Sequence, residues 1–232
     1  EDLGDGDHTS LCCIPADERG RMKLLCKQEG IIAGIEIAQM ILYRLDPEMK
    51  MEQILSDGAR VKVGDIAFYV EGRLQSLLQA ERILLNIMQR MSGVATQTAI
   101  YADRIADLHT KVLDTRKTTP GMRVLDKMAV KIGGGENHRI GLFDMILLKD
   151  NHIGAAGGVA NAVRMAKEYA PFVRKIEVEV ENLEMLAEAL DAGADIVMLD
   201  KMYKANLKYY KELTIYIKAG RKKLEQEQAE TL

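Results

Sequence analysis

After residue 108 the sequence repeats one pattern, in which a short apolar run is followed by a polar loop and an amphipathic segment. The apolar runs have the length of buried strands, and the amphipathic segments have helical spacing. Strands and helices that alternate in this way form parallel sheets with right-handed crossovers. We therefore predict a β/α-barrel domain over residues 109–232. Its expected strands are residues 111–114, 145–148, 176–180, 196–199 and 213–217, and its expected helices are residues 120–131, 159–169, 183–192 and 205–212, the first of them with Thr119 as N-cap and Pro120 in its first turn.

Residues 1–108 have a different organisation, in which short strands come before long helices. Glycines and a proline separate the apolar runs and mark the expected turns. Together these elements predict an N-terminal α+β sandwich domain with linking helices. The expected elements are a loop at residues 4–10, strands at residues 23–28 and 31–37, a helix at residues 37–45 that ends at Asp46 and Pro47, and a turn, a strand and a second turn within residues 56–66.

The segment at residues 71–108 keeps the three-and-four spacing of a helix that turns one apolar face to a core. Ser92 and Gly93 interrupt it, so we expect two helices joined near these residues. The segment would connect the two domains.

The sequence pattern of residues 56–66, in which DG is followed by V and then GD, also allows a second interpretation. Biotinyl and lipoyl carrier domains share this pattern. The modifiable lysine of a carrier hairpin is not evident here, and short motifs specify function loosely. An ordinary β turn is therefore the better interpretation.

Composition argues against several classes of protein. A net charge of −3 argues against nucleic acid as the main partner, because phosphate-backbone binding depends on excess lysine and arginine. No apolar run approaches the ~20 residues that span a bilayer. The three cysteines are odd in number and lack metal-ligand spacing, so neither a disulfide framework nor zinc is supported, and a cytoplasmic location is expected. The chain does not begin with Met, and we expect further residues upstream.

Charged residues follow the predicted strand ends and a glycine run. In a barrel of β/α units the C-terminal ends of the strands carry the active site, so these residues are predicted to converge. Cations that converge in loops suit a small, strongly anionic ligand. A glycine run by itself is a weak signal, but next to it His138 is better explained by function than by structure. The set comprises Arg116, Lys117, His138, Arg139 and Lys149, with the acidic residues Glu179 and Asp200.

Three sequence motifs carry a resemblance to a known family: DTRKT-PG-R, KxAVxxGGGxNHR and LLKDNHI. Their order and intervals resemble the quinolinate phosphoribosyltransferases, the carboxylating nicotinate-nucleotide pyrophosphorylases of NAD synthesis, over about residues 1–199. The resemblance implies transfer of phosphoribosyl from phosphoribosyl pyrophosphate to quinolinate with decarboxylation. The products would be nicotinate mononucleotide, pyrophosphate and CO₂, and Mg²⁺ would be the cofactor.

The resemblance also implies roles for individual residues. Arg82 would reach the substrate of a neighbouring subunit, which makes the active unit a homodimer or a larger homo-oligomer. The residues implied in substrate binding are Arg82, Arg116, His138 and Arg139, with Lys127 as an additional candidate; those implied in catalysis are Lys117, Lys149, Glu179 and Asp200, of which Glu179 and Asp200 would also hold Mg²⁺.

Each of these residues has a structural alternative. Arg82 fits a solvated helix charge, and Lys127 and Lys131 fit a solvent-facing helix surface. Acidic residues at strand ends are often caps or ion-pair partners. Strand alternation places Glu177 on the same face as Glu179, and the family spacing to Asp200 selects Glu179.

The resemblance breaks after Asp200, where Lys201 replaces the usual asparagine. Two motifs that follow later in sequences of this family, Glu-Ala-Ser-Gly-Gly and Ser-Val-Gly-Ala, are absent from this sequence. We therefore expect an incomplete barrel with an altered 5′-phosphate pocket. Two other functions stay open: a paralogue of the same fold acting on another anionic substrate, and a non-catalytic binding protein.

Overall fold

The structure, a computed structural model, describes residues 2–172 and 174–200. Internal contacts divide the chain into two compact units, Glu1–His138 and Arg139–Leu232, and each unit is described by itself. The division predicted at residue 108 stays a prediction. Of the helices within the described ranges, none is both long enough and apolar enough to span a bilayer.

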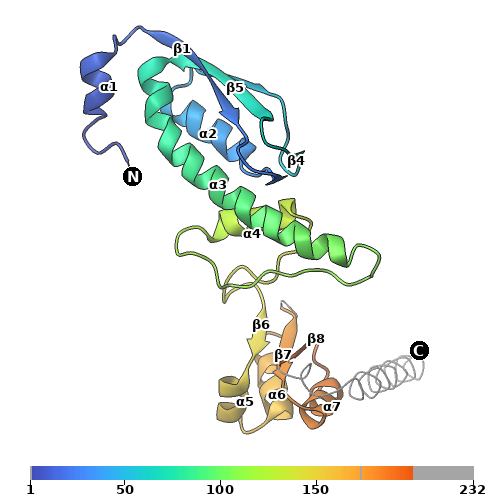
Figure 1. Cartoon of the computed structure of the whole chain (residues 1–232). Helices are drawn as coiled ribbons and strands as arrows, with labels where there is room; N and C mark the ends of the chain where they lie inside the picture. Colours follow the sequence, from blue (N-terminus) through green and yellow to red (C-terminus); the bar gives the residue numbers. More distant parts are fainter. Residues whose placement is uncertain (1, 173, 201–232) are drawn as a thin grey trace. The chain divides into compact units, whose positions relative to one another are not determined.

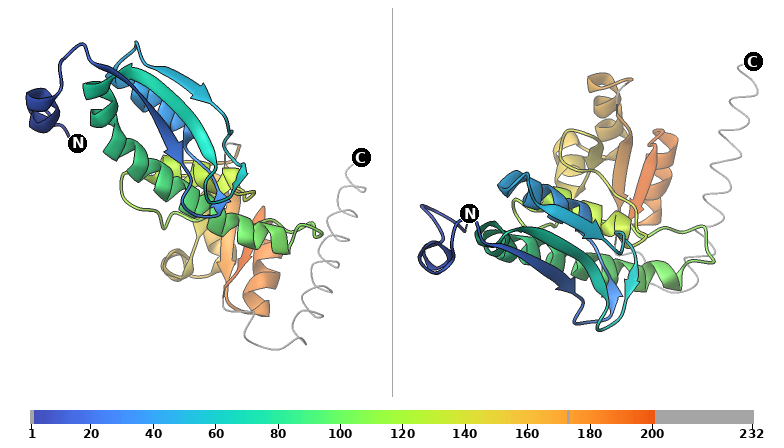
Figure 2. Two further views of the ribbon diagram at one scale, coloured as in Figure 1. Left: turned by 45° about the horizontal axis from the view of Figure 1, so that its top comes forward. Right: turned by 90° about the horizontal axis from the view of Figure 1, so that it is seen from above.

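The first unit is built on a three-stranded antiparallel sheet, and a separate two-stranded ladder lies in the same unit. The three-stranded sheet has the order β1-β5-β3, so β5 is its central strand. Helices α2 and α3 cover one face of this sheet, as Figures 1 and 2 show. The predicted N-terminal sheet domain is confirmed. Its elements are α1 (His8–Cys13), β1 (Arg19–Leu25), β2 (Gly30–Ile31), α2 (Ile35–Leu45), β3 (Lys50–Gln53), β4 (Arg60–Val61), β5 (Ile66–Arg73), α3 (Leu74–Arg104) and α4 (Arg123–Ile132).

Helix α2 begins earlier than the sequence predicts, and the strand expected at residues 31–37 ends at Ile31. Gly34 has φ 99°, which turns the chain from β2 into the helix. The carboxylate of Asp57, from a distant turn, accepts the N–H groups of Gly34 at 2.6 Å and Ile35 at 3.0 Å. A helix start capped from another segment leaves no local sequence signal. The loop expected at residues 4–10 is also wrong in part, because α1 begins at His8.

Helix α3 is continuous through Ser92 and Gly93, so the predicted pair of helices is wrong. Its buried face runs without interruption through Met88, Met91 and Ala95, and burial of this face outweighs the cost of one exposed glycine, about 1 kcal/mol. Ser92 also serves the fold, because its Oγ accepts the N–H of Ala33 at 2.9 Å. The polar residue that resembled a break therefore anchors the segment between β2 and α2.

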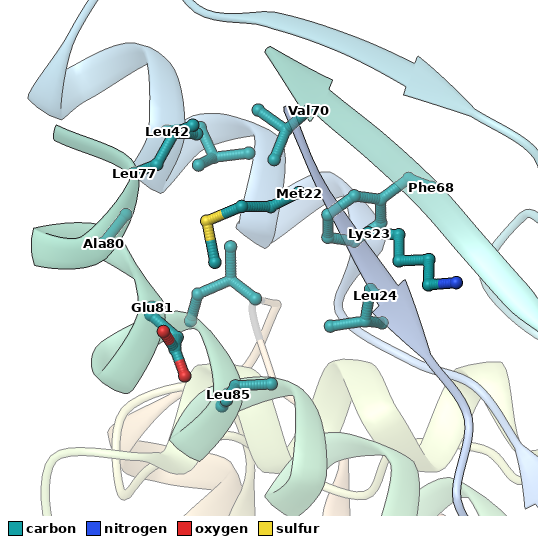
Figure 3. Close-up of a pocket in the computed structure, with 11 residues that line it drawn as sticks. Met22, Lys23, Leu24, Leu42, Phe68, Val70, Leu77, Ala80, Glu81 and Leu85 are labelled. Atoms are coloured by element: carbon teal, nitrogen blue, oxygen red, sulfur yellow. The ribbon is translucent and has the colours of Figure 1, made fainter. Parts of the chain in front are cut away.

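A cavity of about 120 Å³ lies between the first sheet and helices α2 and α3 (Figure 3). Apart from Lys23 and Glu81, its lining is apolar and belongs to the core of the first unit. Among the described residues, no predicted site residue lines it. The cavity is a packing gap in the N-terminal core. Its lining residues are Met22, Lys23, Leu24, Leu42, Phe68, Val70, Leu77, Ala80, Glu81, Leu84 and Leu85.

The second unit contains a parallel sheet in the order β6-β7-β8, with helices between the strands (Figure 1). The central strand is almost wholly buried, as expected for a parallel strand covered on both faces. A C-terminal α/β domain is therefore confirmed, and the barrel stays a prediction. The elements are β6 (Ile146–Leu148), α5 (Asp150–Ala156), α6 (Val159–Tyr169), β7 (Ile176–Val180), α7 (Leu183–Asp191) and β8 (Ile196–Leu199). The strand expected at residues 213–217 and the helix expected at residues 205–212 lie outside the described residues.

The strand expected at residues 111–114 is reduced to a single bridge between Leu113 and Glu136, within the first unit. Leu113 is 55% exposed, so its apolar character does not mark a buried strand. The following helix, α4, has Met122 rather than Thr119 at its N-cap position. Gly121 adopts φ 78° and turns the chain before the helix begins.

Candidate active site

A buried carboxylate, that of Asp114, joins three parts of the first unit; its side chain is 7% exposed. Its Oδ1 accepts the Nζ of Lys127 on α4 at 2.5 Å and the backbone N–H of His138 at 2.8 Å. In the orientation that satisfies both acceptors, the amide nitrogen of Asn137 donates to Asp114 Oδ2 at 2.8 Å and to the Lys127 carbonyl at 2.9 Å. The start of the DTRKT motif, helix α4 and the loop after the triple glycine thus meet at one carboxylate.

The alternative that Lys127 faces solvent is wrong, because its side chain is 4% exposed. Its amine donates to Asp114 and, at 3.0 Å, to the carbonyl of His138. Lys131, one helical turn further on, is half exposed and pairs with Glu136, which agrees with the surface position expected for it. Substrate binding by Lys127 stays a prediction.

The triple glycine is required by close packing against α3. A Cβ at Gly133 would lie 2.3 Å from the Ala95 carbonyl oxygen, and one at Gly135 would lie 2.9 Å from Thr98 Cγ2, both on α3. Gly134 between them has φ 88°. The structure therefore explains these glycines by the close approach of their backbone to helix α3. This packing sets where the chain emerges toward Asn137 and His138.

The loop that carries Arg116 and Lys117 is held by helix α4. Asp126 accepts the N–H of Thr119 at 3.2 Å, and Arg123 Nε donates to Thr118 Oγ1 at 3.2 Å. Lys117 is exposed and Arg116 is half-buried. The structure therefore keeps both cations on one anchored loop in the first unit.

Asp126 is anchored in turn by Arg90 of α3, which donates two hydrogen bonds of 2.7 Å to its carboxylate. This contact raises the pKa of the Arg90 guanidinium. Sequence reasoning missed Arg90 and Asp126, as it missed the role of Asp114. In the sequence these residues are visible only as acidic and basic positions among residues that become buried. This pattern does not identify which of them form ion pairs.

Arg82 lies on α3 and is exposed, in keeping with the predicted reach beyond its own subunit. The described residues of the second unit include Arg139, which is 9% exposed and donates from Nη1 to the Met145 carbonyl at 3.3 Å. Substrate binding by these two arginines stays a prediction.

Lys149, Glu179 and Asp200 lie at the carboxyl ends of neighbouring strands of the second unit. Lys149 comes directly after β6, Glu179 lies on β7, and Lys149 Nζ donates to Glu179 Oε2. The Asp200 N–H, directly after β8, donates to the Val180 carbonyl at 2.9 Å. Because the strands are parallel and in register, these residues share the carboxyl edge of the sheet.

The turn after β6 is closed locally, because the backbone N–H of Lys149 donates to His152 Nδ1 at 3.1 Å. Lys149 is 41% exposed and Glu179 is 18% exposed in their side chains. The pair is therefore accessible at the sheet edge, and the family spacing had selected Glu179 over Glu177, which is 3% exposed.

The predicted residues are thus divided between the two units. The first unit holds Arg82, Arg116, Lys117, Lys127 and His138, and the second holds Arg139, Lys149, Glu179 and Asp200. Mg²⁺ is commonly bound by one or two carboxylates together with substrate phosphates, and the second group offers two carboxylates. Within residues 2–172 and 174–200 there is no cluster of three or more His, Cys, Asp or Glu side chains able to hold a metal.

Both parts of the chain match family profiles. Quinolinate phosphoribosyl transferase, N-terminal domain, matches residues 7–92, and the C-terminal domain of the same family matches residues 94–225. The second match corrects the end of the resemblance, which the sequence motifs had placed near residue 199. The altered segment after Asp200 thus remains within the family pattern for about 25 further residues.

Individual relatives agree with this match. A probable nicotinate-nucleotide pyrophosphorylase [carboxylating] of Synechocystis is 42% identical over 202 residues, which cover 87% of this chain and 68% of that protein. The chloroplastic nicotinate-nucleotide pyrophosphorylase [carboxylating] of Arabidopsis thaliana is 45% identical over 212 residues, with 87% of this chain covered but 60% of the relative.

A solved structure, NadC from Streptococcus pyogenes, superimposes with a TM-score of 0.89 at 39% identity, and the match covers 94% of this chain and 76% of that one. The chain thus spans 60% to 76% of the length of these three proteins. Since both domain profiles and close relatives agree over most of its length, the chain belongs to the quinolinate phosphoribosyltransferase family.

Proposed function

We propose that the protein transfers the phosphoribosyl group of phosphoribosyl pyrophosphate to quinolinate and releases CO₂, pyrophosphate and nicotinate mononucleotide. The observation that carries the proposal is the placement of Lys149, Glu179 and Asp200 along the carboxyl edge of one parallel sheet in a member of this family. Ligands of parallel α/β sheets bind outside this edge. A cation and two carboxylates there suit a reaction that separates a ribosyl cation from pyrophosphate.

The cations supply recognition of the substrates, which carry many negative charges. Arginine binds a carboxylate through two parallel hydrogen bonds, and lysine supplies a compact charge. We assign Arg116, His138 and Arg139 to the carboxylates of quinolinate. Lys117 and Lys149 would neutralise charge on substrate and pyrophosphate. Helix α4 holds the backbone of both Arg116 and His138, because Arg123 donates to the Arg116 carbonyl and Lys127 to the His138 carbonyl. This anchoring supports the assignment, since a fixed backbone presents its side chain without reorganisation.

The two carboxylates of the second unit would act on the ribose and on the metal. Glu179 and Asp200 would hold Mg²⁺, which supplies positive charge to the departing pyrophosphate. The same carboxylates stabilise the oxocarbenium-like ribose as the bond to pyrophosphate breaks. Lys149, paired with Glu179, keeps that side chain directed along the sheet edge.

Decarboxylation follows from the chemistry of the ring. Once the nitrogen carries ribose, it stabilises the electron pair left on the neighbouring carbon as CO₂ departs, and that carbon then takes a proton from water. The protein then positions and neutralises the reactants, so we propose no covalent nucleophile.

The exposed position of Arg82 supports an active unit of at least two subunits, in which Arg82 reaches the substrate of the neighbouring subunit. A cytoplasmic location is likewise a proposal, since the similar plant proteins include chloroplastic and mitochondrial forms.

A comparison of substrates tests the assignment. The protein should form product from quinolinate and phosphoribosyl pyrophosphate, releasing CO₂ and pyrophosphate in equal amounts. Nicotinate, which lacks the second carboxylate, should react at least about 100-fold more slowly, because the side chains assigned to that carboxylate lose their partner. Equal or faster reaction of another anionic base would contradict quinolinate as the substrate and favour a paralogue of the same fold.

A further inference from the structure

Asp114 is a buried acidic group to which the proposed chemistry gives no direct task. It lies one residue before Thr115 and two before Arg116, yet its side chain turns inward and is 7% exposed. Its two oxygens accept from Lys127 Nζ, the His138 N–H and the Asn137 amide. We propose that Asp114 is a positioning residue, which fixes His138 for the quinolinate carboxylate, with Lys127 as its counter-ion. The inference rests on the proposed function.

The contacts fix the main chain on both sides of the His138 Cα. The N–H of His138 donates to Asp114, and the carbonyl of His138 accepts from Lys127 Nζ at 3.0 Å. Two peptide groups held by one ion pair leave the direction of the Cα–Cβ bond little freedom. The imidazole therefore starts from a defined position, and the loop does not need to be ordered by substrate binding.

Charge balance makes Asp114 hard to replace. The Lys127 side chain is 4% exposed, and a buried ammonium without a counter-charge is strongly disfavoured. An uncharged side chain at residue 114 would release Lys127 from its place, and the His138 carbonyl would lose its donor. The carboxylate thus controls two of the contacts that hold the loop, one directly and one through lysine.

Asp46 provides a matched control. It is fully buried, lies in the same unit and pairs with Arg73 Nε at 2.8 Å. Its carboxylate accepts from the Glu48 N–H at 3.1 Å and from Arg73 Nε, so it joins the end of α2 to the end of β5 rather than to the 136–138 loop. Asp46→Asn therefore removes the ion pair of another buried carboxylate, whose arginine partner is half exposed, without removing a contact of His138.

The first arm of the test is amide hydrogen exchange without ligand. Asp114→Asn should raise the exchange rate of the His138 N–H by about tenfold or more, and Asp46→Asn should leave it unchanged. Asp114→Glu keeps the charge but displaces the carboxylate, so it should also expose this N–H and serves if the Asn variant does not fold. Unchanged His138 exchange in both Asp114 variants overturns the inference, whatever the protein binds.

The second arm is a double-mutant cycle with quinolinate affinity as the readout. Asp114→Asn should weaken binding about tenfold in the wild-type background and less than about threefold in a His138→Ala background, because the residues act as one unit. Equal losses in both backgrounds would show that Asp114 does not act through His138. If the wild-type protein binds no quinolinate, the proposed function fails, and the exchange arm alone decides whether Asp114 fixes the loop.

Discussion

At the scale of single residues, the Lys149–Glu179 pair couples the end of β6 to β7. The two residues are 30 positions apart in the sequence, so their contact depends on the parallel pairing of the strands. In our account Glu179 contributes its charge at the reacting ribose, and Lys149 holds the carboxylate in place.

Glu179→Gln keeps the size of the side chain and removes the charge. We expect kcat to fall by about 100-fold, as expected when one electrostatic contact to a charged transition state is lost. The fold should be retained, since Gln can still accept from Lys149. Steady-state kinetics should be compared with Glu184→Gln, an exposed residue in the first turn of α7, which should behave as wild type. A Glu179→Gln enzyme with normal kcat would remove Glu179 from the mechanism.

Asp46 gives a residue-scale prediction about pH. The hydrogen bond from Arg73 lowers its pKa from 3.8 to about 2. The folded state therefore binds the proton more weakly than the unfolded chain, and the stability gained is full above about pH 4 and lost as pH falls to about 2. Asp46→Asn should lower the free energy of unfolding by about 2 kcal/mol at neutral pH.

The measurement is denaturant unfolding of both proteins between pH 7 and pH 2. The difference between wild type and Asp46→Asn should shrink as the pH drops below about 4. A difference that stays constant over this range would mean that Asp46 keeps an ordinary pKa.

At the scale of elements, two glycines should respond in opposite ways to alanine. Gly93 is exposed within α3, and a Cβ there meets nothing within 4 Å. Gly93→Ala should therefore raise the free energy of unfolding by about 0.5–1 kcal/mol. At Gly133 the Cβ would lie 2.3 Å from the Ala95 carbonyl oxygen, and we expect a loss of about 1–3 kcal/mol.

Thermal unfolding of both variants checks the pair. Gly154→Ala on α5, an exposed helical position in the second unit where a Cβ also meets open space, should likewise stabilise the protein. Destabilisation by Gly93→Ala would show that α3 bends at Ser92 and Gly93, as the sequence pattern alone suggested.

Most elements of the second unit were predictable because their signals are local. The strands at β7 and β8 and the helices α6 and α7 were placed within one residue of the structure, since each has a regular apolar pattern of its own. Elements whose ends depend on distant residues were not. Asp57 determines where α2 begins, and the buried face of α3 overrides the break suggested by Ser92 and Gly93.

The site shows the same division. Arg116, His138 and Lys149 were identified from the family motifs, because the residue combinations around them are rare. The contacts of Asp114 with Lys127 and of Asp126 with Arg90 were missed, since each pair joins different segments and becomes visible only through burial. The candidate site residues could thus be predicted from sequence motifs, whereas the buried ion pairs that hold them in place could be identified only in the folded structure.

At the scale of the whole molecule, the proposal that Arg82 serves a neighbouring subunit predicts complementation. Arg82→Ala and Lys149→Ala should each lose most activity. After dissociation and mixing in equal amounts, a dimer should regain about a quarter of the wild-type activity, because half of the dimers carry one site free of both substitutions. No recovery despite verified subunit exchange would place Arg82 and Lys149 in the same site of one subunit.

The most direct test of the central claim is calorimetric titration of the protein with quinolinate, with and without Mg²⁺ and phosphoribosyl pyrophosphate, followed by assay of the same sample for nicotinate mononucleotide. We expect quinolinate to bind and product to form once phosphoribosyl pyrophosphate and Mg²⁺ are present. Binding without product would contradict the enzymatic claim and indicate a binding protein with a family pocket. No binding of quinolinate under any of these conditions would contradict the substrate assignment itself.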